Sequence, residues 1–559
     1  MKRRGLLIPA LIAGLFLAGY VFAPLWSLFK SSLLVDGSFS LERYAAVLDF
    51  SEAANAEAVL NSVGVSLVSV LCAGVIGLLL AFVLTQFDFP CRRLLARLAV
   101  LPVALPPLVG VIAFLLVFGE SGILPRLAAS VTGLRPAALS LDGLPAIIAI
   151  HVYSFYIYFY LLISAALRQL DGASLEAASV LGSGAWRTFY RVVLPQLKPA
   201  LTGGAILTFM ASMASFSAPL LFAGSHRFLT LQIYSMKLNG DIDLAAAQSV
   251  VLMFISMVFF LGLAVLSARA QRGGGGKGAP RTAPLAVPQR TRRILVALVA
   301  GVVVIGILPL LVIGLVSFAK EGSWTWQLLP SSYTLENYSL LLRDPNSFAP
   351  LLNSLVMAFV AAAGAVIIGV SGALVVDRGG RRGGRVVLDS LLTLPYAIPG
   401  TVIALALILA FSGPSPLTGN QALVGTFWIL PLAYLVRTYP FVQRSATSAL
   451  ALLDPSLPEA GEILGAGPWR RWRRIILPSI LPGITVGALF VVITALGEFV
   501  SSILLYTYAS RPVSVEILAQ LRNFNFGAAA AYCVLLLGVI LLFVSVSGKI
   551  SDRTGFPVG

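Results

Sequence analysis

Long apolar runs recur along the whole chain and constrain its fold more than any other feature. Two of them are LLIPALIAGLFLAGYVFAPLW, from Leu6, and FVVITALGEFVSSILLYTY, from Phe490. A helix of ~20 apolar residues crosses ~30 Å of hydrocarbon, and only helices or closed barrels satisfy the backbone in lipid. Continuous runs favour helices, and only 11% of the residues are charged, against about 25% in soluble domains. We therefore expect an all-α polytopic membrane protein.

The runs predict about twelve transmembrane helices. With the N-terminus in the cytoplasm, most of the 39 lysines and arginines fall in cytoplasmic segments, as the positive-inside rule describes. This distribution explains the formal charge of +16 without nucleic-acid binding. The first run is longer than the ~7–15 residues of a signal-peptide core, so we expect it to be retained. The expected spans are about 6–29, 58–86, 98–118, 143–167, 200–222, 247–268, 294–317, 348–376, 386–410, 422–443, 483–507 and 526–548.

The chain contains the same unit twice, in the same orientation. A Gly/Pro/Arg-rich stretch, 269–293, has the composition of a flexible linker and bisects the sequence. Segments on either side of it match in order: LERYAAVL (41–48) with LENYSLLL (335–342), Asn61-Ser62 with Asn353-Ser354, and LPVALPPLVGVIAFLLVFG from Leu101 with LPYAIPGTVIALALILAFSG from Leu394. We expect two tandem parallel six-helix repeats, with domains at 1–268 and 294–559.

Two basic segments repeat a polar skeleton between the fourth and fifth spans of each half. They read EAASVLGSGAWRTFYRVVLP (176–195) and EAGEILGAGPWRRWRRIILP (459–478). Each predicts a short helix, a glycine elbow and a second basic helix at the cytoplasmic surface; Ser456 and Glu459 have capping-box spacing. An interfacial amphipathic elbow and a docking surface for a two-fold soluble partner both fit. The candidate residues are Glu176, Ala177, Gly182, Trp186, Arg187, Pro195, Glu459, Ala460, Gly465, Trp469, Arg470 and Pro478.

These segments resemble the EAA loop of the transmembrane subunits of binding-protein-dependent ABC importers. In that family the loop forms coupling helices that dock on the ATPase subunits, so the resemblance makes Glu176, Gly182, Glu459 and Gly465 docking residues. The second copy departs from the pattern at Gly461, where the family has alanine. The resemblance implies two copies of an ABC ATPase subunit and an extracytoplasmic substrate-binding protein as partners. It also implies a bacterial inner-membrane location with both termini cytoplasmic, and a transport subunit that is not an enzyme.

The fused layout, with LPYAIPGTVIAL and NFNFGAAAAY, looks most like permeases of the ferric-iron uptake type. Importers of the same class for thiamine, aminophosphonate or polyamine are the alternatives. We expect no cofactor on this chain. The stretch GGGGKGAP (273–280) has Gly where a P-loop needs Ser or Thr, so ATP is expected to bind the partner subunit.

Few polar residues interrupt the spans. Glu498 is an intramembrane carboxylate, and such groups usually face a cavity or a partner; counted from the two Glu-Ala pairs, its counterpart is Ser215. By resemblance, both residues lie along the translocation path, although Glu498 could instead pair with a neighbouring helix or position a gate. His151 is expected to be packed and hydrogen-bonded. The two histidines do not have metal-ligand spacing (His151 and His226), and the three cysteines give no disulfide framework (Cys72, Cys91 and Cys533).

An ion-coupled secondary transporter is the more distant alternative. It predicts several buried charges near the midplane, and Glu498 and His151 are the only clear candidates.

Overall fold

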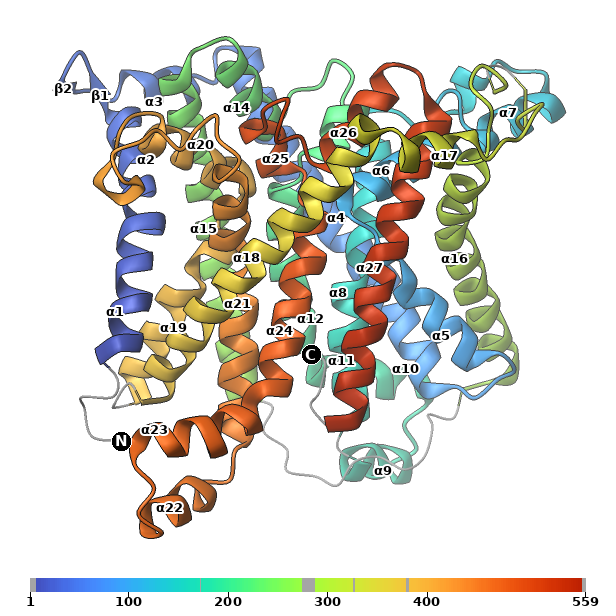
Figure 1. Ribbon diagram of the computed structural model, residues 1–559. Helices are drawn as coiled ribbons and strands as arrows, with labels where there is room; N and C mark the ends of the chain where they lie inside the picture. The colour runs from blue at the N-terminus through green and yellow to red at the C-terminus, as the bar shows by residue number, and fades with distance from the viewer. Residues whose placement is uncertain (1–6, 171, 274–286, 325–326, 379–381, 555–559) are drawn as a thin grey trace.

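A computed structural model describes residues 7–170, 172–273, 287–324, 327–378 and 382–554 (Figure 1). In this part of the chain, regular structure is helical except for one short antiparallel pair, β1 (Leu34–Val35) and β2 (Ser38–Phe39). The all-α prediction is therefore confirmed. Residues 274–286, the middle of the expected linker and most of the GGGGKGAP stretch, lie outside the described residues.

The helices as far as Gly273 form the first half of the fold. They are α1 (Leu7–Phe16), η2 (Leu17–Phe22), α2 (Ala23–Leu33), α3 (Glu42–Val47), α4 (Ala53–Gln86), α5 (Arg92–Val100), η3 (Leu101–Ala104), α6 (Pro107–Phe118), α7 (Ile123–Thr132), η4 (Pro136–Leu139), α8 (Gly143–Arg168), α9 (Gly172–Val180), α10 (Ala185–Thr188), η5 (Phe189–Val193), α11 (Leu194–Gln196), α12 (Lys198–Met213), α13 (Ser217–Phe222), α14 (Leu229–Leu238) and α15 (Ile242–Gly273).

The helices from Gln289 form the second half. They are α16 (Gln289–Val316), α17 (Glu336–Arg343), α18 (Pro345–Arg378), α19 (Arg382–Ala397), α20 (Gly400–Phe411), η6 (Pro416–Thr418), α21 (Ile429–Leu452), α22 (Ser456–Ile463), α23 (Pro468–Arg471), η7 (Trp472–Ile476), α24 (Leu477–Leu496), α25 (Val500–Leu505), α26 (Val513–Arg522) and α27 (Phe526–Thr554).

Every expected span overlaps at least one of these helices. Nine described helices are long and apolar enough to cross a membrane, and two bent pairs raise the number to 11. The bends are 63° between Ala185–Gln196 and Lys198–Met213, and 93° between Gly384–Ala397 and Gly400–Phe411. The remaining expected span, 422–443, corresponds to α21, which is not among these candidates.

Helix α21 is a central helix of the second half, and glycines let its neighbours approach it closely. A Cβ at Gly369 of α18 would lie 2.8 Å from the backbone nitrogen of Gln443, and one at Gly487 of α24 would lie 2.8 Å from the Cα of Val442. Because lipid gives helices no hydrophobic reason to associate, small residues at such contacts supply close van der Waals packing. Protein therefore surrounds much of α21, which allows it to carry polar residues.

Four of the expected spans are broken rather than continuous. The repeated proline motifs end one helix and begin another: Pro106 precedes α6, and Pro399 precedes α20. The fifth span of each half, expected to run to residue 222 or 507, instead stops at Met213 or Leu496 before the short helices α13 and α25. Proline cannot donate a backbone hydrogen bond, and irregular backbone at membrane depth is tolerated where protein or a cavity surrounds it.

The first helix of each half packs against the other half (Figure 1). The ring of Phe16 in α1 lies 5.4 Å from that of Tyr439, and the hydroxyl of Tyr20 donates to the carbonyl of Leu417 at 2.7 Å. Reciprocally, α16 packs on α4, α5 and α6, and Arg292 donates to the carbonyl of Asp88. The two halves are therefore joined by an exchange of their first helices.

The repeated Asn-Ser pairs anchor a loop of their own half. The Ser62 hydroxyl accepts a hydrogen bond from Leu229 N at 3.0 Å, and the Ser354 hydroxyl accepts one from Val513 N at 2.8 Å. Asn61 donates to the carbonyl of Arg227, and Asn353 donates to two carbonyls in the equivalent loop. The sequence match thus marks equivalent contacts at the start of α14 and of α26.

Candidate functional site

The two repeated basic segments form the same elbow at the same end of the molecule (Figure 1). Helix α9 ends at Val180, two residues before Gly182, whose φ is +70°; α22 ends at Ile463, two residues before Gly465, whose φ is +77°. In the first copy, Gly182 N donates to Ser179 O at 3.0 Å and Ser183 N donates to Ala178 O at 2.9 Å; the equivalent bonds in the second copy have the same two lengths. This is the Schellman pattern, in which glycine adopts the left-handed conformation at little cost.

After each glycine the chain starts a second helix that leads into a span. Helices α10 and α23 begin after Gly184 and Gly467, pass through the π turns η5 and η7, and reach the Leu-Pro pairs. Pro195 and Pro478 lie in the first turns of α11 and α24, where a missing N–H is tolerated. In the second copy, Pro468–Leu496 forms a single span-length helix from the elbow inward.

The outer surface of each elbow is apolar and exposed. Val180 and Leu181 are 88% and 84% exposed, and their counterparts Ile463 and Leu464 are both 86% exposed. Trp186 and Trp469 are exposed as well. Around these side chains lie the predicted Glu176, Ala177, Arg187, Glu459, Ala460 and Arg470, all exposed. Exposed apolar clusters of this kind mark interaction sites with protein or membrane.

The departure of the second copy at Gly461 has a steric cause. A Cβ at Gly461 would lie 2.7 Å from Cδ1 of Ile475 and 3.4 Å from Cγ of Arg471. The first copy has the smaller Val192 and Thr188 at these two positions, together with the buried Ala178. In the second copy the buried Arg471 pairs with Glu462, so larger side chains occupy the space that an alanine would need.

The capping-box prediction for Ser456 and Glu459 is wrong. Helix α22 starts at Ser456 with Pro455 as its N-cap, and no side chain caps it there. Asp454 instead accepts the backbone N–H of Ser456 at 2.9 Å, and this bond lowers the pKa of the Asp454 carboxyl. An aspartate two residues upstream fulfils the role because its short side chain reaches back to the chain in an Asx turn.

A central cavity of about 380 Å³ lies between the two halves. Its lining includes the broken segments of both halves, around Pro106, Pro399, Ser215 and Glu498. The fifth-span breaks have equivalent geometry: Thr230 donates to Ser215 O at 2.9 Å, and Ser514 donates to Glu498 O at 2.9 Å. The structure therefore brings the two predicted interior residues into one cavity.

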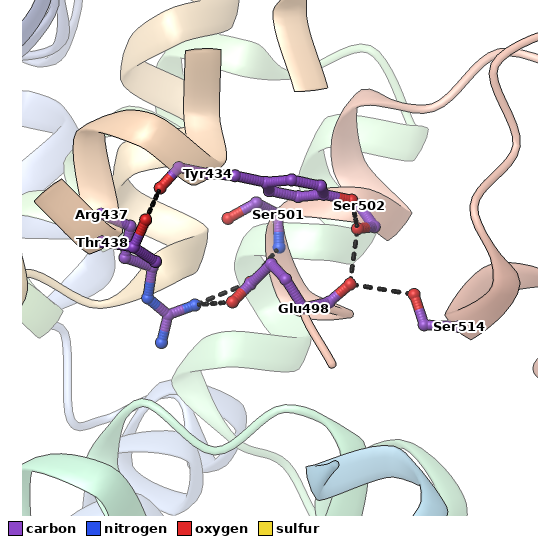
Figure 2. A network of polar contacts seen from close by, with 7 residues as sticks. All are labelled: Tyr434, Arg437, Thr438, Glu498, Ser501, Ser502 and Ser514. Atoms are coloured by element: carbon purple, nitrogen blue, oxygen red, sulfur yellow. Dashed lines mark hydrogen bonds and ion pairs between the residues drawn. The ribbon is translucent and has the colours of Figure 1, made fainter. Parts of the chain in front are cut away.

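Glu498 forms an ion pair with Arg437 of α21 (Figure 2). Arg437 Nη1 donates to both carboxylate oxygens, at 2.7 and 2.6 Å, and Ser501 N donates to Oε1 at 3.0 Å. Ser502 bonds to the carbonyl of Glu498 and to the hydroxyl of Tyr434, both at 2.7 Å. The carboxylate thus ties the break between α24 and α25 to α21, and it lines the cavity at the same time.

Sequence reasoning missed Arg437. Counted from the Glu-Ala pairs, the counterpart of Arg437 is Ser154, as that of Glu498 is Ser215, and all four residues line the cavity. The two charges therefore replace two serines at matched positions of the repeat. An arginine inside an expected span was the signal that could have found the pair, since such a charge normally has a partner.

The histidines are both hydrogen-bonded. His151 is buried, and its Nδ1 lies 2.9 Å from the Ser212 hydroxyl and 3.3 Å from that of Ser69, as expected for a packed histidine. His226 Nδ1 lies 3.1 Å from Glu57 at the other end of the molecule. The three cysteines are free, and among the described residues no three His, Cys, Asp or Glu side chains form a group that could hold a metal ion.

One known protein family matches both halves of the chain. The model of the family described as "Binding-protein-dependent transport system inner membrane component" matches residues 73–272 and again residues 365–554. The chain is 27% identical over 541 residues to a probable ABC transporter permease, y4fN, of Sinorhizobium fredii, covering 95% of this chain and 94% of that one.

Two further relatives have names that state a substrate. The ferric transport permease FbpB of Actinobacillus pleuropneumoniae is 25% identical, with 82% of this chain matching 66% of that protein. The putative 2-aminoethylphosphonate permease PhnV of Salmonella paratyphi A is 29% identical, with 44% of this chain matching 90% of it. The chain therefore spans just under two thirds of the ferric relative, and the phosphonate relative spans about half of the chain.

Proposed function

The chain belongs to the family of binding-protein-dependent transport system inner membrane components, and from this premise we propose that its two elbows dock on two copies of an ABC ATPase subunit. As a member of that family it is a multi-pass inner-membrane permease subunit of an ABC importer, not itself an enzyme. The proposed domains are 1–268 and 294–559, joined through 269–293. Both termini are proposed to lie in the cytoplasm, because the positive-inside rule places the basic elbows there.

One observation carries the docking proposal. The same elbow occurs twice at one end of the molecule, with the same glycine conformation and the same exposed apolar triplet (Val180, Leu181, Trp186 and Ile463, Leu464, Trp469). A headgroup-level amphipathic helix needs neither two copies nor a matched geometry. Two equivalent short helices suit two grooves of a two-fold partner, which explains why the elbow is repeated.

The geometry supplies a mechanical link from the elbows to the cavity. The helix Pro468–Leu496 runs from the second elbow to the break that contains Glu498. ATP-driven closure of the partner subunits moves the elbows, and in the second half this continuous helix transmits the movement to the cavity lining. The two halves then expose the cavity alternately to either side, and no covalent chemistry takes place on this chain.

Ferric iron, delivered by an extracytoplasmic binding protein, is the proposed substrate. The support is the ferric relative that matches 82% of this chain. An aminophosphonate is the second candidate, supported by a relative that matches 44% of the chain. Thiamine and polyamine remain alternatives within the same class of importer.

The docking proposal is tested by replacing the elbow carboxylates. The double variant Glu176→Gln, Glu459→Gln should lose uptake of labelled ferric iron in cells that lack the native chain, and it should no longer copurify the ATPase subunit. Asp88→Asn is the matched control: this carboxylate is fully exposed at the same end, outside the elbows, with a loose 3.6 Å pair to Arg92. It should behave like the native chain, since such surface pairs contribute about 0–1 kcal/mol.

The two readouts separate docking from substrate identity. ATPase copurification that survives the double variant would refute docking through these residues. If the native chain restores no iron uptake although the ATPase copurifies, the iron assignment is wrong, and labelled 2-aminoethylphosphonate is the next substrate to test.

A further inference from the structure

The guanidinium of Arg437 is engaged on one side only. Nη1 donates both of its hydrogen bonds to Glu498, and Nε and Nη2 have no hydrogen bond to any residue in the described part of the chain. Figure 2 shows the second terminal nitrogen directed away from the carboxylate. The side chain is 25% exposed and lines the central cavity, so two donor positions of a charged group are available there.

A glycine makes room for this arrangement. A Cβ at Gly400, the first residue of α20, would lie 2.6 Å from Nη1 and 3.2 Å from Cζ of Arg437. Any side chain at this position would displace the guanidinium from Glu498. The first half has Pro107 at the matching position of its proline motif and Ser154 in place of the arginine. The glycine that leaves room and the arginine that occupies it therefore occur together, and only in the second half.

The charges of the cavity lining cancel. Arg437 and Glu498 are the only Lys, Arg, Asp or Glu side chains among the described residues that line it. A bare trivalent cation would find one carboxylate there, already paired, and an adjacent guanidinium of like sign. Burying an uncompensated charge is costly, and the tyrosine, serine and threonine hydroxyls of the lining are neutral oxygens that do not offset a trivalent charge. The lining does not suit a bare ferric ion, but it suits a cargo that brings its own anionic groups.

We propose that Arg437 binds an oxyanion group of the transported substrate, with Glu498 as the positioning residue that orients the guanidinium. This inference rests on the transport function proposed above. The oxyanion is a carboxylate of a ferric chelate or the phosphonate of an organophosphonate. Arginine suits both because its planar fork donates two parallel hydrogen bonds to a carboxylate or phosphate-like group. Ser154 and Ser215 carry no charge, so charge-assisted recognition is confined to the second-half wall.

Binding to the purified chain tests the proposal directly. The chain, with its ATPase partner, is placed in lipid nanodiscs and titrated with ferric citrate, with 2-aminoethylphosphonate and, as a cationic control, with thiamine. One oxyanion probe should bind the native chain, and Arg437→Gln should weaken that binding at least tenfold. Arg444→Gln is the matched control: it lies on the same helix but is mostly exposed and pairs loosely with Asp389 at 3.7 Å, so its affinity should be native.

A second variant separates recognition from structure. Arg437→Gln combined with Glu498→Gln keeps a neutral hydrogen-bonding pair between α21 and the break, so folding does not depend on a lone buried charge. Recognition by the guanidinium predicts that this double variant also binds the oxyanion at least tenfold more weakly. Native affinity in the double variant would overturn the proposal, since Arg437 would then be a structural partner only.

The choice of probe identifies the oxyanion. Binding of ferric citrate assigns a chelate, and binding of 2-aminoethylphosphonate assigns a phosphonate. If neither binds the native chain, or if only thiamine binds, the proposal is wrong. ATPase copurification in the same preparation is independent of these titrations, so the docking proposal stands or falls separately.

Discussion

Gly461 illustrates how single residues set the shape of an elbow. It belongs to the short helix α22, where glycine is less favourable than alanine by about 1 kcal/mol. Its Cβ position is occupied by the end of the Ile475 side chain, at 2.7 Å. The first elbow solves the same packing problem with Ala178 and Val192. The two elbows therefore share one backbone conformation but fill the space beside it with different side chains.

This packing predicts a coupled effect of two substitutions. In the native background, Gly461→Ala should be close to neutral, because the gain in helix propensity is offset by contact with Ile475 Cδ1. In an Ile475→Val background that atom is absent, and Gly461→Ala should stabilise α22 by about 1 kcal/mol. Hydrogen exchange of the α22 amides measures this as roughly fivefold slower exchange. An equal effect in both backgrounds would show that Ile475 does not restrict residue 461.

At the scale of elements, short helices and the breaks between helices position the segments that line the cavity. The Asn-Ser pairs near the start of α4 and α18 hold the first residues of α14 and α26. These contacts fix the loops that follow the fifth-span breaks, and Thr230 and Ser514 in the same segments bond to the carbonyls of Ser215 and Glu498. One chain of hydrogen bonds in each half therefore supports the cavity wall.

Removing either serine hydroxyl should loosen this support. Ser354→Ala leaves the N–H of Val513 without its acceptor, and Ser62→Ala does the same for Leu229. An unsatisfied buried donor costs about 1–3 kcal/mol, so each variant should lower the thermal unfolding midpoint of the purified chain. Ser479→Ala is the control, because this exposed hydroxyl has, within the described part of the chain, one hydrogen bond, to Ile475 O of the preceding turn. Unchanged midpoints in both variants would contradict the anchoring function.

At the scale of the whole molecule, the exchange of first helices makes each half depend on the other. Helices α1, η2 and α2 contribute Phe16, Val21 and Leu28 to a core that contains residues of both halves, and α1 and α2 pack on α18 and α20 of the second half. Helix α16 contributes Val299 and Val303 to a second core, whose other fully buried members among the described residues belong to the first half. The interface between halves therefore contains buried side chains from both sides.

This exchange predicts that the halves associate without a covalent link. A protease site introduced between Gly273 and Gln289 allows the purified chain to be cut. The two fragments should then copurify in mild detergent, because the α1 and α16 contacts remain intact. A variant that also lacks residues 1–33 should copurify less well and should lose stability in its second-half fragment. Separation of the cut native fragments would show that the linker, and not helix exchange, holds the halves together.

The sequence alone determined the class of fold, the duplication and the elbows. These features follow from local signals: apolar runs of span length, matched segments in order, and glycines where the backbone needs positive φ. Hydropathy alone did not determine where helices break, since Pro106, Pro399 and the Ser215 and Glu498 segments all lie inside apolar runs. The capping box failed because Asp454 competed for the same N–H.

The tertiary structure alone decided which distant residues meet. Arg437 lies on α21 and Glu498 lies in the break between α24 and α25. Helix α21 carries Arg437 because protein surrounds that helix and Gly400 leaves space for the guanidinium. The exchange of α1 and α16 is also invisible to local pattern, since an apolar helix has the same sequence signature whichever neighbour it contacts. Contacts between distant residues depend on shape and charge in three dimensions. Only the tertiary structure therefore reveals the ion pair of the cavity, which is the one ion pair that lines it among the described residues.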